Sequence, residues 1–327
     1  MMNARLNDYH YDLPRELIAQ RPLERREDSR MMVLHRNRQT IEHRQFPELK
    51  AFLSPRDLLV LNDTRVIPAR RFSNDGAIEF LFIDRICPGR WKCLVKPGRK
   101  MRVGASAEIG NAILRIEEIL PEGQRIVSLD KDVDLYAGGW MPLPPYIGRK
   151  SDEEDNARYQ TVFARASGAL AAPTAGLHFT PQILSEISHT FITLHVGIGT
   201  FLPVRSENLA EHRMLAESFL ISAQAANKIN NAQRIVAVGT TTVRVLESAR
   251  WKNGRLLAQE GSTNLFVYPP YRFQHLDLLL TNFHLPRSTL LMLVSAFAGR
   301  EFLLRAYREA IRERYRFYSY GDCMLII

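Results

Sequence analysis

The sequence predicts an α/β protein, with a largely parallel sheet and a smaller antiparallel β domain inserted into it. Short apolar runs recur along the chain, and each ends in a dense cluster of polar residues. Such runs are typical of parallel strands that are buried on both faces. From residue 78 to 129, apolar and polar residues alternate instead, which favours antiparallel strands. The length of 327 residues exceeds the roughly 100–200 of one domain, so we expect two domains.

The N-terminal part supplies the first elements of the α/β domain. Residues 12–22 are predicted to form a short helix that is limited by Pro14 and Pro22, because proline interrupts a helix interior. A strand is expected at residues 31–34. The apolar run 58–61 is the next predicted strand, and it leads into the polar cluster 62–65.

The middle of the chain is predicted to be an antiparallel meander or small barrel. Its short runs are separated by turn residues at 97–98, 110–111 and 121–123. Proline-rich residues 141–147 suit a rigid connection between domains, because proline fixes φ and removes a donor. We therefore expect residues 1–66 and 148–327 to form the large α/β domain, and residues 67–147 the inserted β-barrel domain.

The C-terminal half repeats the pattern of apolar run and polar turn. The runs lie at residues 169–172, 191–196, 235–238 and 278–280. Thr180, Ser222 and Ser288 are predicted N-caps of helices, since their hydroxyls can accept a hydrogen bond from the first turn. Another helix should follow the Gly-Thr-Thr-Thr turn at 239–242. Residues 301–315 are predicted to form an amphipathic helix, and its arginines recur at helical spacing.

These polar turns together indicate where chemistry would occur. In an open parallel sheet, ligands bind beyond the carboxyl ends of the strands. Five such ends would place His178, His195, His284, Asn62, Asp63, Asn282 and several threonines along one rim. Any one of these residues could belong to an ordinary polar loop, but five ends in one chain favour a shared site.

Composition limits the class of protein. The formal net charge of +9 favours a polyanionic partner such as a nucleic acid, although many basic enzymes bind none. Three cysteines without a CxxC pair argue against a disulfide framework and for the cytoplasm. No apolar run reaches the ~20 residues needed to cross a bilayer. The first 14 residues contain no apolar core of a signal peptide, so we expect no secretory signal.

Several catalytic motifs are missing. Gly197 and Gly199 follow an apolar run, but the third glycine of a dinucleotide fingerprint is absent and there is no P-loop. There is no HxH or HExxH pattern to favour a metal site, and no GxSxG elbow. The remaining histidines, threonines and asparagines fit general acid–base chemistry on a polar substrate. A metal-dependent nucleotide hydrolase remains an alternative.

The chain resembles one known family along almost its whole length. The matching segments are YDLPRELIAQRP (11–22), LVLNDTRVIPAR (59–70), MPLPPYI (141–147), YQTVFARASGALAAPTAGLHFT (159–180), TLHVGIGTFLPV (193–204), VAVGTTTVRVLES (236–248), TNFHLPRSTLLMLVSAFAG (281–299) and YRFYSYGDCMLI (315–326). They are similar to the S-adenosylmethionine:tRNA ribosyltransferase-isomerases of queuosine biosynthesis.

The resemblance implies a fold and a reaction. It implies an α/β/α domain with an inserted β-barrel. The reaction moves and isomerises the ribosyl part of S-adenosylmethionine onto 7-aminomethyl-7-deazaguanine at the tRNA wobble position, and it gives epoxyqueuosine-tRNA, adenine and methionine. S-adenosylmethionine is then a substrate, no cofactor or metal is expected, and we expect a monomer away from membranes. A catalytically inactive tRNA-binding protein on the same scaffold is the alternative.

We assign site residues under this resemblance. His178, His195 and His284 are the candidate acid–base groups. The candidates for holding S-adenosylmethionine and the modified base, or for stacking on adenine, are Asp63, Arg65, Phe179, Thr200, Phe201, Thr240, Thr241, Arg244, Glu247, Asn282 and Phe283. Core packing is an equally good interpretation of the phenylalanines. The candidate tRNA contacts are Lys96, Arg99, Lys100, Arg149 and Lys150, although a solvated hairpin would also explain the first three.

Some positions depart from the family pattern. Leu215 stands where a second histidine is usual, Asn264 replaces a common aspartate, and Pro270 replaces a common glycine. We therefore assign no catalytic role to position 215.

Overall fold

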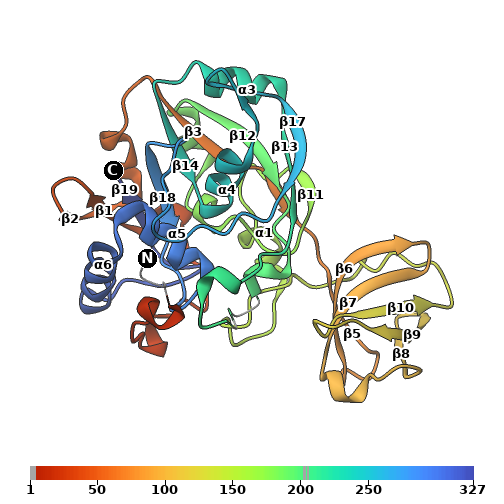
Figure 1. Cartoon of the computed structure of the whole chain (residues 1–327). Coiled ribbons are helices and arrows are strands. Elements are labelled where there is room, and N and C mark those ends of the chain that lie inside the picture. The colour runs from red at the N-terminus through yellow and green to blue at the C-terminus, as the bar shows by residue number, and fades with distance from the viewer. Residues whose placement is uncertain (1–4, 202–203, 205) are drawn as a thin grey trace. The chain divides into compact units, whose positions relative to one another are not determined.

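The computed structural model describes residues 5–201, 204 and 206–327, without the side chains of residues 200 and 201. It divides into two compact units (Figure 1). The first contains residues 1–65, 145–149 and 160–327, and the second contains residues 66–144 and 150–159. Relative to the expected boundary at residue 147, residues 145–147 lie with the first unit and residues 150–159 with the second.

Within the described residues of the first unit, nine strands form one mixed sheet. In spatial order they are β17 (Gln259–Thr263), β13 (Glu217–Ile221), β12 (His189–Leu194), β3 (Asp57–Asn62), β14 (Arg234–Val238), β18 (Leu278–Asn282), β19 (Cys323–Ile326), β1 (Arg30–His35) and β2 (Thr40–Gln45). β12, β3, β14 and β18 run parallel to one another. The prediction of a parallel core is therefore confirmed, and four of the five predicted apolar runs lie in these four strands.

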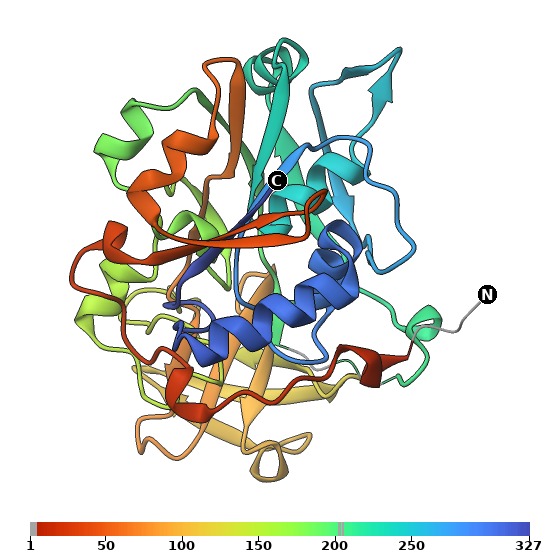
Figure 2. The same ribbon diagram turned by 90° about the vertical axis from the view of Figure 1, so that its left-hand side faces the viewer.

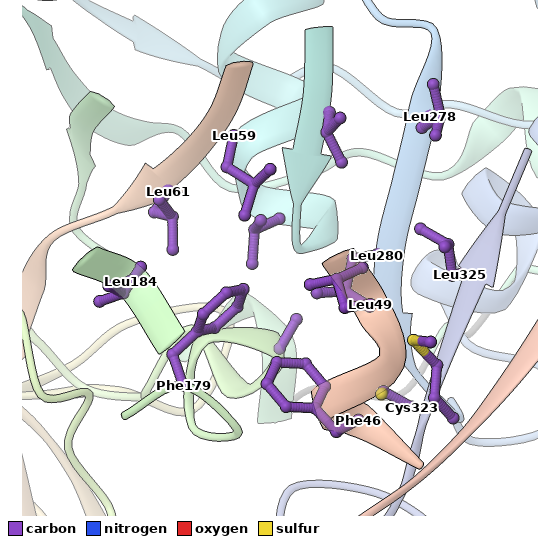
Figure 3. Close-up of a cluster of buried hydrophobic side chains, with 14 of the residues drawn as sticks. Phe46, Leu49, Leu59, Leu61, Phe179, Leu184, Leu278, Leu280, Cys323 and Leu325 are labelled. Atoms are coloured by element: carbon purple, nitrogen blue, oxygen red, sulfur yellow. The ribbon is translucent and has the colours of Figure 1, made fainter. Parts of the chain in front are cut away.

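The sheet is covered on both faces. Leu59, Leu61 and Leu280 point toward the 3₁₀ helix η4 (Phe46–Phe52) and the helix α2 (Pro181–Ser185), where Phe46, Phe179 and Leu184 complete a buried cluster (Figure 3). The alternate side chains of the same strands face the other way. There α3 (Ala223–Asn230) and α4 (Thr240–Ser248) pack on β3 and β12. Figure 2 shows η4 in orange and α2 in light green on one side of the sheet, with α4 and the blue α5 (Thr289–Ala298) on the other.

The predicted N-caps of the helices are confirmed. Thr180, Ser222 and Ser288 each accept a hydrogen bond from the amide three residues later, at the starts of α2, α3 and α5. α4 begins after Gly239, whose φ of +89° suits a residue without a Cβ. The long amphipathic helix α6 (Arg300–Arg312) packs beside α5. The remaining 3₁₀ helices of this unit are η1 (Leu6–Tyr9), η2 (Arg15–Leu17), η3 (Arg26–Asp28), η6 (Thr174–Gly176), η7 (Ile198–Phe201) and η8 (Leu209–Glu211).

Two predicted elements of the first unit are wrong. Residues 12–22 contain only η2, because the Ala19 amide and the Leu17 carbonyl bond instead to the backbone of Phe317. The run 169–172 is not a strand of the main sheet. β11 (Ala166–Ala169) ends where that run begins, and it pairs with β4 (Thr64–Val66) in a separate two-stranded sheet. A second small pair joins β15 (Trp251–Lys252) and β16 (Arg255–Leu256).

The second unit contains the predicted antiparallel strands. Its described residues form a six-stranded sheet in the order β5 (Arg70–Phe72), β6 (Glu79–Cys87), β7 (Arg90–Lys96), β10 (Arg125–Leu129), β9 (Ala112–Ile119) and β8 (Ser106–Ile109). Asn74 donates its amide to the carbonyl of Glu108 and pairs with Gly110, which links the two ends of the sheet. The alternating residues Phe80, Phe82, Trp91 and Cys93 fill its core, as their spacing predicted. η5 (Gly98–Lys100) and α1 (Glu153–Arg158) also belong to this unit.

Candidate active site

The carboxyl ends of the four parallel strands lie side by side at one edge of the sheet. They present Asn62 from β3, Leu194 and then His195 from β12, Gly239 and the start of α4 from β14, and Asn282 from β18. Adjacent strands are about 4.8 Å apart, so the edge from β12 to β18 is roughly 15 Å long. The three candidate histidines therefore fall into two groups. His195 lies at the β12 end, whereas His178 and His284 lie at the β18 end.

Asn62 joins β3 to the end of β12. Its Oδ1 accepts the Leu194 amide at 3.0 Å and its Nδ2 donates to the Leu194 carbonyl at 2.9 Å. The same Oδ1 accepts the Thr64 amide at 3.1 Å, and Nδ2 lies 3.5 Å from the Thr241 Oγ1. A side-chain amide thus takes the place of a backbone peptide where the ladder between the two strands ends. The result is a fixed position for the first residue beyond β12, which is His195.

His195 is half-buried and uses one ring nitrogen within the described structure. Its Nδ1 lies 2.8 Å from the Thr64 Oγ1. Partial burial lowers its pKa below 6.5, and the nearby carboxylate of Asp63 opposes this shift. Asp63 is itself buried, and accepts hydrogen bonds from the Thr193 hydroxyl at 2.6 Å and from Arg165 at 2.7 Å. The imidazole is therefore neutral at pH 7 and has an Nε2 that makes no hydrogen bond to the described residues.

His178 is bonded at both ring nitrogens. Nδ1 lies 2.8 Å from the Ser29 hydroxyl, and Nε2 lies 3.2 Å from the Asn282 Oδ1. Because Oδ1 can only accept, Nε2 is assigned the proton. Burial lowers the pKa of His178 to about 4. This side chain is a neutral link between the N-terminal segment and the end of β18, and it has no free nitrogen for proton transfer.

His284 is also buried, but one ring nitrogen makes no hydrogen bond to the described residues. Its Nε2 lies 2.8 Å from the Thr281 Oγ1. Its backbone is held at both polar atoms, since the amide donates to the Tyr307 hydroxyl and the carbonyl accepts from the Tyr11 hydroxyl. Burial lowers the pKa of His284 to about 3, so the ring is neutral at pH 7.

Four predicted substrate contacts are already engaged within the protein fold. Phe179 is fully buried against Phe46, and Phe283 packs among Tyr307, Tyr315 and Phe317, so neither ring is available to adenine. Phe283 directly follows β18, and Phe179 lies between η6 and α2; both side chains are part of the apolar core.

The two charged residues of α4 also have partners within the fold. Arg244 forms a buried ion pair with Glu217 and donates to the carbonyls of Thr263 and Leu265. Glu247 accepts from the Tyr271 hydroxyl and from the amides of residues 274 and 275. Both side chains thus have partners within the fold, and their contacts to charged groups of a substrate stay predictions.

The other candidates lie at several places. Thr240 and Thr241 are the first residues of α4, next to Asn62, and Asn282 contacts His178. Arg65 is exposed in the first unit, and Arg149 donates to the Gln20 carbonyl there. Lys96, Arg99, Lys100 and Lys150 are exposed in the second unit. The side chains of Thr200 and Phe201 lie outside the described residues.

Sequence reasoning missed the residues that hold the candidates in place. These are Ser29, Thr64, Thr193, Glu217 and Thr281. Glu217 binds the Gly197 amide at 2.8 Å and so fixes the start of the loop after His195. Only Thr64 and Thr281 gave a signal, because they lie in the polar clusters after strands. Ser29 is separated from His178 by 149 positions, which no local pattern reveals.

The residues that the structure describes contain no group of three or more His, Cys, Asp or Glu side chains placed to hold a metal ion. None of their helices combines the length and apolar character that a membrane span requires.

Known proteins match the chain along nearly its full length. The model of the family described as "Queuosine biosynthesis protein" matches residues 6–326. A protein of Acetivibrio thermocellus named S-adenosylmethionine:tRNA ribosyltransferase-isomerase is 48% identical over 341 residues, which cover 98% of this chain and 99% of that protein. A protein of the same name from Moorella thermoacetica is 49% identical over 343 residues, with 99% and 100% covered.

A solved structure is similar too. The crystal structure of S-adenosylmethionine tRNA ribosyltransferase from Thermotoga maritima is 40% identical, covers 98% of this chain and 100% of its own, and superposes with a TM-score of 0.57. It supports the α/β fold with the inserted six-stranded barrel. On the strength of the match from residue 6 to residue 326, this chain belongs to the queuosine biosynthesis protein family.

Proposed function

We propose that the chain is an S-adenosylmethionine:tRNA ribosyltransferase-isomerase. It transfers and isomerises the ribosyl part of S-adenosylmethionine onto 7-aminomethyl-7-deazaguanine at the tRNA wobble position. The products are epoxyqueuosine-tRNA, adenine and methionine. Full-length relatives of that name support this function. The observation in this chain that supports it best is the edge of the sheet with a neutral, partly bonded histidine at each end.

The first chemical step suits His195. The sulfonium acidifies the 5′ carbon beside it, and a neutral imidazole can accept that proton. The Nε2 of His195 makes no hydrogen bond to the described residues, and its pKa lies below 6.5, so the basic form is the major one at pH 7. His195 is therefore our candidate for the general base.

The departure of adenine suits His284. If the Thr281 hydroxyl donates to Nε2, the proton of the neutral ring is on Nδ1 and can form a hydrogen bond to the leaving base without leaving the ring. A neutral imidazole can serve as such a hydrogen-bond donor when burial keeps its pKa low. His178 then positions Asn282 and takes no proton itself.

The middle of the edge suits the polar parts of the substrate. Thr240 and Thr241 begin the nine-residue helix α4, where free amides and the helix dipole favour an anion. We assign them to the methionyl carboxylate or to the ribose hydroxyls. Arg65 remains a candidate for an anionic group of the substrates, and Thr200 and Phe201 remain candidates from the sequence.

We further assign tRNA contacts to Lys96, Arg99, Lys100, Arg149 and Lys150. All five except Arg149 are exposed, and three of them lie at or beside η5. We also propose that the two compact units are separately folded domains and that the enzyme acts as a monomer.

Release of adenine tests the function. Purified protein is incubated with adenine-labelled S-adenosylmethionine and with tRNA that carries 7-aminomethyl-7-deazaguanine. The proposal requires adenine release that depends on this tRNA, together with transfer of ribose label to the tRNA. A folded protein that binds the tRNA but releases no adenine would instead be the inactive RNA-binding alternative. Adenine release without tRNA would indicate a hydrolase.

A further inference from the structure

We propose that Thr64 is a positioning residue, which orients the His195 imidazole and stabilises the imidazolium that forms when Nε2 takes a proton. This inference rests on the proposed role of His195. Thr64 is fully buried, and its Oγ1 lies 2.8 Å from the His195 Nδ1. The same oxygen lies 3.4 Å from the Ala166 carbonyl. The hydroxyl therefore has a histidine on one side and a backbone acceptor on the other.

Gly168 holds the ring from the neighbouring strand. A Cβ built on Gly168 would lie 2.9 Å from the His195 Nδ1, 3.0 Å from Cε1 and 3.1 Å from Cγ. Real Cβ atoms rarely approach so closely, so this backbone can reach the imidazole only because residue 168 is glycine. Its φ of +146° is also unfavourable for other residues. The ring is thus confined between the small β4–β11 sheet and the end of β12.

Asn62 fixes both partners of the contact at once. Its Oδ1 accepts the amide of Thr64 and the amide of Leu194, at 3.1 and 3.0 Å. Thr64 and Leu194, the residue before His195, are thereby held relative to a single side chain that is 1% exposed. A hydrogen bond between two positioned groups loses little entropy on forming, and so it can select one ring orientation.

The proton positions on the His195 ring and the Thr64 hydroxyl are consistent with His195 acting as a base through Nε2. When His195 accepts a proton on Nε2, both ring nitrogens carry hydrogen. Nδ1–H then donates to the Thr64 Oγ1, and the Thr64 hydroxyl donates to the Ala166 carbonyl. No proton leaves the ring through Thr64. Among the described residues, the charged groups near this ring are the Asp63 carboxylate and, paired with that carboxylate, the guanidinium of Arg165.

The test compares Thr64→Val, which keeps the shape but removes the hydroxyl, with Thr64→Ser, which keeps the hydroxyl. Thr190→Val is the matched control, since Thr190 is buried on β12 and makes no side-chain hydrogen bond among the described residues. For each variant we would measure kcat and KM for S-adenosylmethionine by adenine release. The pKa of His195 would be measured by NMR titration of its ring.

We expect Thr64→Val to lower kcat by about 10- to 100-fold, the range for one hydrogen bond to a charged group, with little change in KM. It should also lower the pKa of His195, because the imidazolium loses its acceptor. Thr64→Ser should restore both quantities to within about 3-fold and about 0.3 pH units of the wild type. Thr190→Val should change neither.

The inference is overturned if Thr64→Val leaves kcat and the pKa of His195 unchanged, or if Thr64→Ser is as impaired as Thr64→Val. If Thr64→Val does not fold, Gly168→Ala is the second variant. It keeps the hydroxyl but displaces the ring, and an undiminished kcat would then count against the inference. The NMR titration needs no turnover, so an inactive wild-type protein would refute the proposed function and still leave the Thr64–His195 contact open to measurement.

Discussion

His178, His195 and His284 show how one residue type is adapted to different tasks by its neighbours. His178 is bonded at both ring nitrogens, whereas His195 and His284 are each bonded at one by a threonine hydroxyl. His195 is half-buried and close to a carboxylate, and His284 is buried with no charged group among the described residues close enough to shift its pKa. The positions of His195 and His284 after strands could be read from the sequence, whereas His178 follows the 3₁₀ helix η6 and not the predicted strand. Their hydrogen-bond partners could not, because those partners come from distant segments.

The pH dependence of turnover should report His195. A general base acts in its deprotonated form, and burial lowers the pKa of this histidine below 6.5. We expect kcat/KM to be constant above that pKa and to fall about tenfold per pH unit below it. Adenine release measured from pH 4.5 to 9 would check this. If kcat/KM already falls as the pH is lowered from 9 to 7, the assignment of His195 as the base is contradicted.

The stability of the protein should fall in acid because of His178 and His284. Their pKa values are about 4 and about 3 in the folded state, against about 6.5 when unfolded. Between these pKa values the unfolded state binds more protons than the folded state. The contribution of each neutral histidine to the free energy of unfolding is therefore fully present above pH 6.5 and is lost as the pH falls. Between pH 7 and pH 5, each of the two histidines should lower the free energy of unfolding by about 2 kcal/mol.

Chemical denaturation at pH 7 and pH 5 measures that loss. His178→Gln cannot titrate, so its free energy of unfolding should fall by about 2 kcal/mol less than that of the wild type over this range. His10→Gln is the control, because His10 is exposed. An equal loss in wild type and His178→Gln would rule out the linkage.

At the scale of single elements, local signals were reliable and long-range pairing was not. The caps at Thr180, Ser222 and Ser288 depend on atoms within one helical turn, and all three were predicted. The segment 12–22 has a helical pattern, but its backbone pairs with Phe317 across almost the whole chain. A pattern within eleven residues contains no information about such a partner.

The role of α4 can be tested at Arg244. Replacing it with Met leaves Glu217 buried and unpaired, which should lower the free energy of unfolding by about 3–5 kcal/mol. Lys50→Met is the control, since its pair with Glu186 is exposed and should contribute less than about 1 kcal/mol. Denaturant unfolding and S-adenosylmethionine binding would both be measured. Weakened binding with unchanged stability would favour the substrate contact that the sequence predicted.

At the scale of the whole chain, the alternation of apolar residues was enough to predict the barrel, and the polar clusters were enough to predict the parallel sheet. The order of the strands was not predictable. Nothing local to residues 323–326 shows that they lie between β18 and β1. The link from Asn74 to Gly110 that joins the ends of the barrel sheet also depends on two turns far apart in sequence.

The charge of the second unit should govern tRNA affinity. We expect the triple variant Lys96→Gln, Arg99→Gln, Lys100→Gln to bind tRNA more weakly. The slope of log K against log[salt] should become shallower by roughly 2, because up to three phosphate contacts are lost. The control removes the same number of exposed arginines from α6, at 305, 308 and 312. If the α6 variant weakens tRNA binding more than the variant of residues 96, 99 and 100, the tRNA-binding surface lies on α6 instead.

The place of β19 in the sheet has a consequence for synthesis of the protein. β1 and β2 are the first strands of the sheet to leave the ribosome, yet among the described strands β1 joins the rest of the sheet through β19 alone, where Met31 pairs with Cys323. One edge of the nascent hairpin therefore stays without its partner until nearly the whole chain has been translated. Unpaired edges attract other chains. This hairpin is where we would look for chaperone binding during translation.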